Sequence, residues 1–304
     1  GWGQGLARPY TGSAADRDVQ RQLNDLDVLI VGSFPERLTA EYRKRARLVF
    51  RYSERPLKNG NPILKYIPRF LRWHYYDPPW RKTYMLCASA FTAGDYAKFG
   101  LFRGRCYQWG YFPETIRYAN IDELIGCKEK TTILWCGRFL DWKHPDDVLE
   151  AARRLRDAGY SFRFELIGTG EMEPEMRTAA ARRGLTDRVI FAGVQSDVPA
   201  FMNAFDLFLL PSNFEGSPVT LVEAQGCGVP CLASTNVPDD GSVTDLVHFL
   251  PLAAPLTDWA AKAEAIAAHG DHDDHWAALS AAGYELKTAA RRMEQLYDKL
   301  GGHA

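Results

Sequence analysis

The stretch Asn213-Phe-Glu-Gly-Ser-Pro-Val-Thr-Leu-Val-Glu-Ala224 follows an apolar run, Leu207-Phe-Leu-Leu-Pro211, and together they decide the fold. The run predicts a buried strand, and the stretch predicts a helix that begins directly after it, with Ser217 as N-cap and Pro218 at the first helical position. The free amides and the positive dipole end of this helix then face the carboxyl edge of the strand, where an anion such as a diphosphate binds. Gly216 has no side chain, which lets a ligand approach the backbone.

Two glutamates in this stretch are placed to hold the ends of such a ligand. Glu215 and Glu223 lie eight positions apart. Glu223 comes about six residues after the N-cap, so it lies roughly 9 Å along the helix axis. The two carboxylates could bracket a sugar diphosphate, one binding hydroxyls of the sugar and the other those of a ribose. The alternative is that both are solvated first-turn residues favoured by the helix dipole, and the spacing alone does not separate these readings.

A second strand-to-helix loop supplies positive charge. The apolar run Thr131-Thr-Ile-Leu-Trp-Cys136 leads into Gly137-Arg138 and then Asp141-Trp-Lys143-His-Pro145, ahead of an amphipathic helix. Arg138 and Lys143 therefore fall at the edge of a parallel sheet where ligands usually bind. Arg offers phosphate a planar fork and Lys a point charge, each contact being worth roughly 1.5–3 kcal/mol. Two cations can neutralise a departing diphosphate without a metal, so we expect a nucleoside-diphosphate sugar as donor substrate and no further cofactor.

Other motifs carry weaker signals. Gly168-Thr-Gly170 follows an apolar run, but Glu173 occupies the place of the third glycine in a dinucleotide fingerprint, so we expect a strand-to-helix turn that touches the nucleotide. The histidines and aspartates of 271–275 formally contain a D-x-D pattern, yet they join two alanine-rich segments, and we expect a solvated turn and no metal site. His144 is expected to start a helix and not to act as a base.

The order of segments predicts two α/β domains. With 304 residues and 46% hydrophobic content the chain can bury two medium cores. We expect a thin first domain of four strands over 1–125 and a doubly wound second domain with a helical tail over 126–304. The six cysteines form no C-x-x-C pair, which favours reduced thiols in a cytoplasm. No apolar run approaches 18 residues, and the first residues contain no signal-peptide pattern.

The predicted strands are 27–32, 47–52, 84–88, 106–112, 131–136, 162–168, 189–192, 207–210 and 229–233; the predicted helices are 36–46, 92–99, 119–130, 145–158, 173–183, 198–204, 218–226 and parts of 256–300.

Positive charge is concentrated in residues 41–82. Twelve Lys or Arg face three Asp or Glu there, although the whole chain has a formal net charge of −1. Between Pro62 and Lys82 aromatic and aliphatic residues alternate with cations, a composition typical of an interfacial segment on an anionic bilayer. The alternative is an internal loop packed with snorkelling cations. Nucleic acid is the remaining anion, but no zinc-finger or RNP pattern is present, and we expect no nucleic-acid partner.

These motifs together resemble the retaining glycosyltransferases of family 4, the group 1 branch of the GT-B fold. The likeness covers about 120–234. The first part more weakly resembles a bacterial capsule and exopolysaccharide subgroup. The motifs that match the family are Gly137-Arg138 with Lys143, Ile167-Gly-Thr-Gly170, Val189-Ile-Phe-Ala-Gly193, Pro211-Ser-Asn-Phe-Glu-Gly-Ser-Pro218 with Glu223-Ala224, and Gly228-Val-Pro230. Those that match the subgroup are Phe50-Arg-Tyr-Ser-Glu-Arg-Pro56, Cys87-Ala-Ser-Ala-Phe-Thr-Ala93 and Trp109-Gly-Tyr-Phe-Pro113.

The resemblance implies two Rossmann-like domains, the first incomplete, and transfer of a hexose from a nucleoside-diphosphate sugar to a saccharide or lipid-linked acceptor. It implies retention by front-face displacement, with no side-chain nucleophile. By analogy Arg138 and Lys143, with Gly137, bind the donor diphosphate, Glu215 binds the sugar hydroxyls and Glu223 the ribose. The amides around 216–218 then contact the phosphates and sugar.

The first part departs from the family pattern in two ways. Family members often place a histidine on this domain, but the first histidine here is His74. Glu54 is the candidate for a catalytic role on the acceptor side, although it could instead pair with Arg51 or Arg55. The chain also begins where the family would already have passed its first βα units, so about 50 residues are expected to be missing. The alternatives are therefore a non-catalytic nucleotide-sugar or membrane-binding protein, and a sugar epimerase, for which no acid/base carboxylates are clearly placed.

Overall fold

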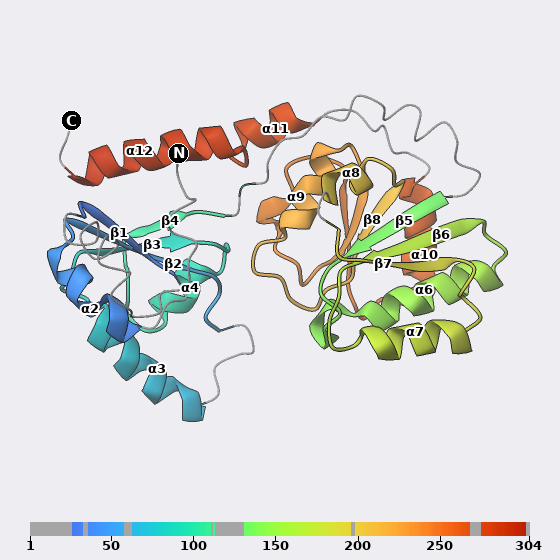
Figure 1. Ribbon diagram of the computed structural model, residues 1–304, viewed down its shortest axis with the longest axis horizontal. Helices are drawn as coiled ribbons and strands as arrows, with labels where there is room; N and C mark the ends of the chain where they lie inside the picture. The colour runs from blue at the N-terminus through green and yellow to red at the C-terminus, as the bar shows by residue number, and fades with distance from the viewer. Residues whose placement is uncertain are drawn as a thin grey trace, which may run out of the picture. The chain divides into compact units, whose positions relative to one another are not determined.

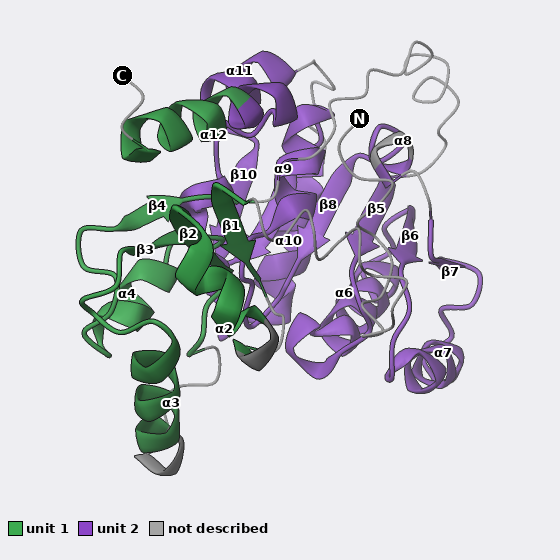
Figure 2. Cartoon of the chain, turned by 60° about the vertical axis from the view of Figure 1, so that its left-hand side comes forward, with its two compact units in different colours: residues 1–110, 291–304 green, residues 111–290 purple. Residues whose placement is uncertain are grey.

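The computed structural model describes residues 26–32, 36–57, 63–110, 112, 131–195, 198–267 and 275–301. The chain forms two compact units, shown in Figure 2: residues 1–110 with 291–304, and residues 111–290. Both units are built on a parallel sheet, and each is described here by itself.

The sheet of the first unit has the strand order β1-β2-β3-β4, and all described pairs are parallel. Successive side chains of a strand point to opposite faces. Met85 and Cys87 therefore join one core, with Phe99, while Leu86 joins another, with Phe50. The strands are β1 (Val28–Val31), β2 (Leu48–Ser53), β3 (Thr83–Cys87) and β4 (Cys106–Gln108); the helices are α2 (Glu36–Arg45), α3 (Ile63–Tyr76) and α4 (Thr92–Ala97).

The last helix, α12 (Leu286–Gly301), packs its second half on this first sheet. Met293, Leu296, Tyr297 and Leu300 lie against the core of Phe50, and the rings of Phe50 and Tyr297 are 5.7 Å apart. The sequence-based domain boundary placed the whole tail in the second domain, which is wrong for this end of the helix. Apolar residues at spacings of three and four show that one helix face is buried, but not against which sheet. The expected boundary near 125 and the predicted helix 119–130 lie outside the described residues.

Four charged side chains form a buried network in the first unit. Arg43 bonds Glu36 at 2.9 Å, and Arg51 bonds Glu36 at 2.7 Å and Asp77 at 2.6 Å. Arg43 also pairs with Asp77, and all four side chains are nearly inaccessible to solvent. Removing one partner of a buried pair leaves an uncompensated charge, so this network ties α2 and β2 to the residue after α3. Two of the twelve cations counted in 41–82 are thus neutralised internally and do not face an external anion.

The sheet of the second unit has the order β10-β9-β8-β5-β6-β7 and is parallel throughout. From β5 the chain moves outward through β6 and β7, then returns to the other side of β5 and moves outward again through β8. The order therefore reverses between β5 and β8, and ligands bind at such a switch point in doubly wound sheets. The strands are β5 (Thr131–Cys136), β6 (Phe162–Ile167), β7 (Val189–Gly193), β8 (Leu207–Leu210), β9 (Cys231–Ser234) and β10 (Val247–Leu250), of which β10 was not predicted.

Helices cover both faces of this sheet, as Figure 1 shows. One core contains apolar residues of α6, α7 and α10, and the other contains those of α8, α9 and α11. The helices are α6 (Pro145–Asp157), α7 (Glu173–Arg182), α8 (Val198–Met202), α9 (Val219–Gly226), α10 (Leu256–Ala267) and α11 (Trp276–Ala281), with two short 3-10 turns, η2 (Asp141–Lys143) and η3 (Asp239–Gly241).

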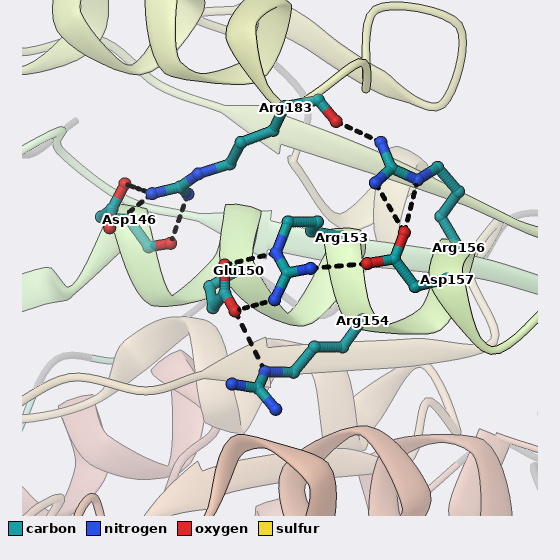
Figure 3. Close-up of polar contacts among 7 residues, drawn as sticks. All are labelled: Asp146, Glu150, Arg153, Arg154, Arg156, Asp157 and Arg183. Carbon is teal, nitrogen blue, oxygen red and sulfur yellow. Dashed lines mark hydrogen bonds and ion pairs between the residues drawn. The ribbon is translucent and has the colours of Figure 1, made fainter.

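Ion pairs cover the outer side of α6 and connect it to the end of α7 (Figure 3). Arg153 bonds Glu150 at 2.6 Å and Asp157 at 2.5 Å, one helical turn in each direction. Arg183, the residue after α7, binds Asp146 at 2.8 Å. Such exposed pairs each contribute little to stability. Their charges neutralise one another, and the pair of Arg183 with Asp146 connects the two helices.

Candidate functional site

The two predicted ligand loops meet at the switch point of the second sheet. The loop after β5 and the loop after β8 are joined by a hydrogen bond of 2.8 Å from the amide of Asn213 to the carbonyl of Trp142. The ammonium of Lys143 forms an ion pair with the carboxylate of Glu215. The structure therefore brings together one cation and one acid that the sequence assigned to the same ligand.

Glu215 is held in place by a residue that sequence reasoning missed. The Ser212 hydroxyl donates to Oε1 of Glu215 at 2.7 Å, and the Ser234 hydroxyl donates to the carbonyl of Ser212 at 2.5 Å. Ser212 and Ser234 are fully buried, and Glu215 is 9% exposed. The sequence signals were a small polar residue two positions after a buried strand and its place within the motif 211–218. Lys143 has three N–H donors, so it can keep Glu215 and still bind phosphate oxygens.

Glu223 is a half-buried carboxylate in the second turn of α9. Within the described part of the chain it makes no hydrogen bond or ion pair, and burial raises its pKa to about 7. The pKa of Cys136, at the carboxyl end of β5, shows that Glu223 lies near this strand end. Burial and the charge of Glu223 raise the pKa of this thiol to about 12, while Lys143 lowers it. Glu223 and Lys143 therefore both lie within electrostatic reach of the end of β5, as the bracketed-ligand hypothesis requires.

The beginning of α9 differs by one residue from the prediction. The helix starts at Val219, Pro218 is the N-cap, and no side chain caps the helix, so the assignment of Ser217 as N-cap was wrong. The Pro218 carbonyl accepts from Leu221 at 2.9 Å, while the Ser217 carbonyl accepts from Val219 at 2.9 Å. A residue before proline is pushed towards extended backbone, which keeps Ser217 outside the helix. The expected contacts of 216–218 with a ligand remain a prediction.

Gly168 and Gly170 allow the loop after β6 to lie against the loop after β5. A Cβ on Gly168, whose φ is +123°, would come within 2.0 Å of the Gly137 carbonyl oxygen. A Cβ on Gly170 would lie 2.6 Å from the carbonyl oxygen of Phe139. These positions require glycine for packing of backbone on backbone. Direct contact of Gly137, Gly168 or Gly170 with a nucleotide stays a prediction.

Arg138 and His144 belong to the same loop after β5. Arg138 is exposed, and in the described ranges no side chain bonds its guanidinium. His144 adopts the left-handed conformation with φ of 50°, is the N-cap of α6, and bonds Asp147 at 2.8 Å. The prediction that His144 starts a helix is therefore confirmed, and Arg138 is left as a cation available to an anionic ligand.

The remaining predicted positions lie elsewhere. Glu54 follows β2 in the first unit and is half-buried. Arg51 binds Glu36 and Asp77, and Arg55 binds Asp95 at 3.1 Å. The catalytic role of Glu54 stays a prediction. Most of the cluster 271–275 lies outside the described residues. In the ranges that the structure describes, no three His, Cys, Asp or Glu gather as metal ligands, and no helix is long and apolar enough to cross a membrane.

Comparison with known proteins finds similarity to glycosyltransferases over the part of the chain that contains this site. Residues 121–267 match the family model of glycosyl transferases group 1. The amylovoran biosynthesis glycosyltransferase AmsK of Erwinia amylovora is 34% identical over 133 residues, covering 41% of this chain and 32% of the relative. An Escherichia coli UDP-Gal:alpha-D-GlcNAc-diphosphoundecaprenol alpha-1,3-galactosyltransferase is 29% identical over 128 residues, covering 40% of this chain and 33% of that protein. The chain thus spans about a third of the length of these curated relatives.

A solved structure extends the likeness to both units. Anabaena HepE in complex with UDP-glucose has a TM-score of 0.70 at 15% identity, covering 96% of this chain and 84% of HepE. This similarity shows the fold: the α/β architecture with two Rossmann-like units predicted from the sequence is that of the GT-B glycosyltransferases.

Proposed function

We propose that this chain, whose second unit contains a domain of the glycosyl transferases group 1, is a retaining hexosyltransferase that uses a nucleoside-diphosphate sugar in the synthesis of a bacterial surface polysaccharide. The observation that carries the proposal is the contact of Lys143 with Glu215 at the switch point of the sheet. Glu223 acts electrostatically on the same strand end as Lys143 and has no partner among the described residues. One cation and two acids in that arrangement fit a ligand with an anionic centre and hydroxyl groups on both sides.

In the proposed reaction Lys143 and Arg138 bind the donor diphosphate. As the bond from the anomeric carbon to the diphosphate oxygen breaks, negative charge grows on that oxygen, and the two cations stabilise it more in the transition state than in the ground state. Glu215 accepts hydrogen bonds from sugar hydroxyls and Glu223 from those of the ribose. The acceptor hydroxyl enters on the same face, and its proton passes to the leaving diphosphate. No cofactor beyond the donor is required.

The finer identity of donor and acceptor rests on the similar proteins. HepE was solved with UDP-glucose, which supports a UDP-sugar as the first donor to test. The Escherichia coli relative acts, by its name, on a sugar linked to diphosphoundecaprenol, which supports a lipid-linked saccharide acceptor. An enzyme with such an acceptor works at the cytoplasmic face of a membrane, and we include peripheral membrane association in the proposal.

Calorimetry with UDP and GDP tests the donor site. We expect Arg138→Ala and Glu223→Ala each to weaken binding by about 1–3 kcal/mol, because each removes a polar contact to the ligand. Arg182→Ala, an exposed arginine on α7, is the matched control and should leave the affinity unchanged. Unchanged affinity in both site variants would rule out this group of residues as the donor site.

Turnover separates the enzyme from a non-catalytic nucleotide-sugar-binding protein. Radiolabelled UDP-hexoses should be hydrolysed slowly without acceptor and faster with a lipid-linked saccharide. Binding of UDP with no release of labelled sugar under either condition would favour the non-catalytic alternative.

A further inference from the structure

Helix α3 in the first unit has one face packed against the rest of that unit. The ring of Tyr66 stacks on Phe99 at 4.8 Å, and Trp73 meets the same ring edge-on at 4.6 Å. Trp73 also contacts Tyr96 at 5.0 Å. This aromatic contact holds α3 on α4 and determines which of its residues turn to solvent.

The opposite side of α3 is apolar and exposed. Ile67, Leu71 and Tyr75 recur every four residues and are 63%, 62% and 78% exposed, and Phe70 beside them is 37% exposed. Trp80, four residues after the helix, is 84% exposed. We call Ile67, Phe70, Leu71 and Tyr75 the outer face of α3; the helix is labelled in Figures 1 and 2. Single exposed apolar residues are common, whereas several on one face of a helix indicate an interaction site.

Cations flank the outer face, and acidic groups do not balance them. Helix α3 contains no Asp or Glu. Arg72 lies on the helix and Lys82 just beyond it, both exposed. The nearest acid in sequence, Asp77, is buried and neutralised by Arg43 and Arg51. The segment 63–82 therefore presents exposed cations and no exposed acid, and its complement is an anionic surface.

We propose that the outer face of α3 inserts into the interfacial layer of an anionic lipid bilayer. Aliphatic side chains bury in the acyl boundary, Trp and Tyr are the side chains favoured at the headgroup level, and Arg and Lys reach anionic headgroups. A second protein copy would meet the same cations, and like charges across a dimer axis would oppose its binding. The proposal rests on the proposed function in one respect, since it places the enzyme where a lipid-linked acceptor is found. It also narrows the expected membrane segment from 41–82 to the outer face with its flanking cations.

Vesicle co-sedimentation tests the apolar part of this surface. Vesicles of phosphatidylcholine with about one-third phosphatidylglycerol should bind the full chain, and pure phosphatidylcholine vesicles should bind it at least about tenfold more weakly. Leu71→Ser should lower the partition coefficient about fivefold, and Ile67→Ser with Leu71→Ser about thirtyfold. Leu286→Ser makes the same change at an exposed leucine outside the outer face and should leave binding unchanged.

Charge reversal tests the electrostatic part. Arg72→Glu with Lys82→Glu should lower binding to the anionic vesicles about tenfold or more, and added salt should weaken wild-type binding. Arg182→Glu with Lys287→Glu changes the net charge equally at exposed positions elsewhere and is the control. If both charge variants lost binding equally, the effect would come from overall charge, and the proposed surface would be refuted.

Two further measurements separate the alternatives. Unchanged vesicle binding in the Ile67→Ser, Leu71→Ser variant overturns the proposal. The proposal is also overturned if the wild type is a dimer in lipid-free solution and this variant is a monomer. UDP calorimetry on the same variant checks that it is folded and should give the wild-type affinity. If it does not, vesicle binding of Arg72→Glu, which leaves the apolar residues intact, is the test of the surface. If the wild type binds vesicles but does not bind UDP, the proposed function is wrong and the proposed membrane surface is unaffected.

Discussion

At the residue scale, Glu223 is a side chain whose environment opposes its charge. Its carboxylate is half-buried and unpartnered among the described residues, and burial raises its pKa to about 7. A carboxylate without hydrogen-bond donors is costly to ionise in a protein, and such costs concentrate at functional sites. A bound ribose would supply the missing donors. Glu215, by contrast, has Lys143 and Ser212 as partners before any ligand arrives.

Replacing Glu223 by Gln should change how stability depends on pH. The folded state keeps this proton up to about pH 7, whereas the unfolded state releases it near pH 4.5. The wild type therefore loses stability from this group as pH rises between these values, and the loss persists above pH 7. We expect Glu223→Gln to be more stable than wild type by about 1–3 kcal/mol at pH 8 and equal to it near pH 4.

The measurement is urea unfolding of both proteins from pH 4 to 8, taking the difference between them. Glu175→Gln, at an exposed position on α7, is the control and should give a flat difference. A flat difference for Glu223→Gln as well would show that this carboxyl group is well solvated.

At the scale of elements, the site depends on how closely the loop after β6 supports the loop after β5. The amide of Phe139 bonds the carbonyl of Thr169 at 3.1 Å, and the amide of Met172 bonds the carbonyl of Phe139 at 3.1 Å. The glycines on either side of Thr169 make this approach possible. The loop that carries Arg138 is thus positioned by backbone contacts to its neighbour.

Gly170→Ala should disturb this arrangement. The added Cβ would lie 2.6 Å from the Phe139 carbonyl oxygen and 2.7 Å from its amide nitrogen, so backbone must move. We expect a loss of about 1–3 kcal/mol in unfolding free energy and a weaker affinity for UDP, measured by denaturation and calorimetry. Gly94→Ala in α4 is the control, because no atom lies within 4 Å of its added Cβ. That variant should be neutral or stabilised by about 0.5–1 kcal/mol, and wild-type UDP affinity in Gly170→Ala would contradict the support role.

At the scale of the whole molecule, helix α12 contributes residues to both units. Its residues up to 290 belong to the second unit, and those from 291 pack on the first sheet. Leu296 and Tyr297 therefore supply core to a sheet whose strands lie between residues 28 and 108, far earlier in the chain.

Leu296→Ala should destabilise the first unit selectively. Truncation of a partly buried leucine costs about 1–3 kcal/mol, and the cost falls on the sheet it covers. Hydrogen exchange followed by mass spectrometry should show reduced protection of β1–β4 and unchanged protection of β5–β10. Gln295→Ala, on the exposed side of the same helix, should change neither. Reduced protection in the second sheet instead would show that this residue packs elsewhere.

Sequence reasoning succeeded where burial leaves a one-dimensional pattern. Both β5 and β8 have the predicted bounds, because strands of a parallel sheet buried on both faces are continuous apolar runs. It missed α3, which contains Pro68, a residue that normally breaks a helix, although Lys65, Arg69 and Arg72 recur at helical spacing. It also missed β10, a short strand that is only partly buried.

The sequence by itself determined the ligand loops of this protein, because strand ends in a parallel sheet meet at one edge whatever the details of packing. Lys143 and Glu215, 72 positions apart, were expected on the same ligand for that reason and are found in contact. The tertiary structure alone decided which charges remain available. Arg51 forms a buried ion pair with Asp77, whereas Arg138 has no paired acid in the described chain. The end of α12 covers the first sheet. Charge neutralisation and apolar cover depend on distance in space, and no local pattern encodes the partner of a side chain.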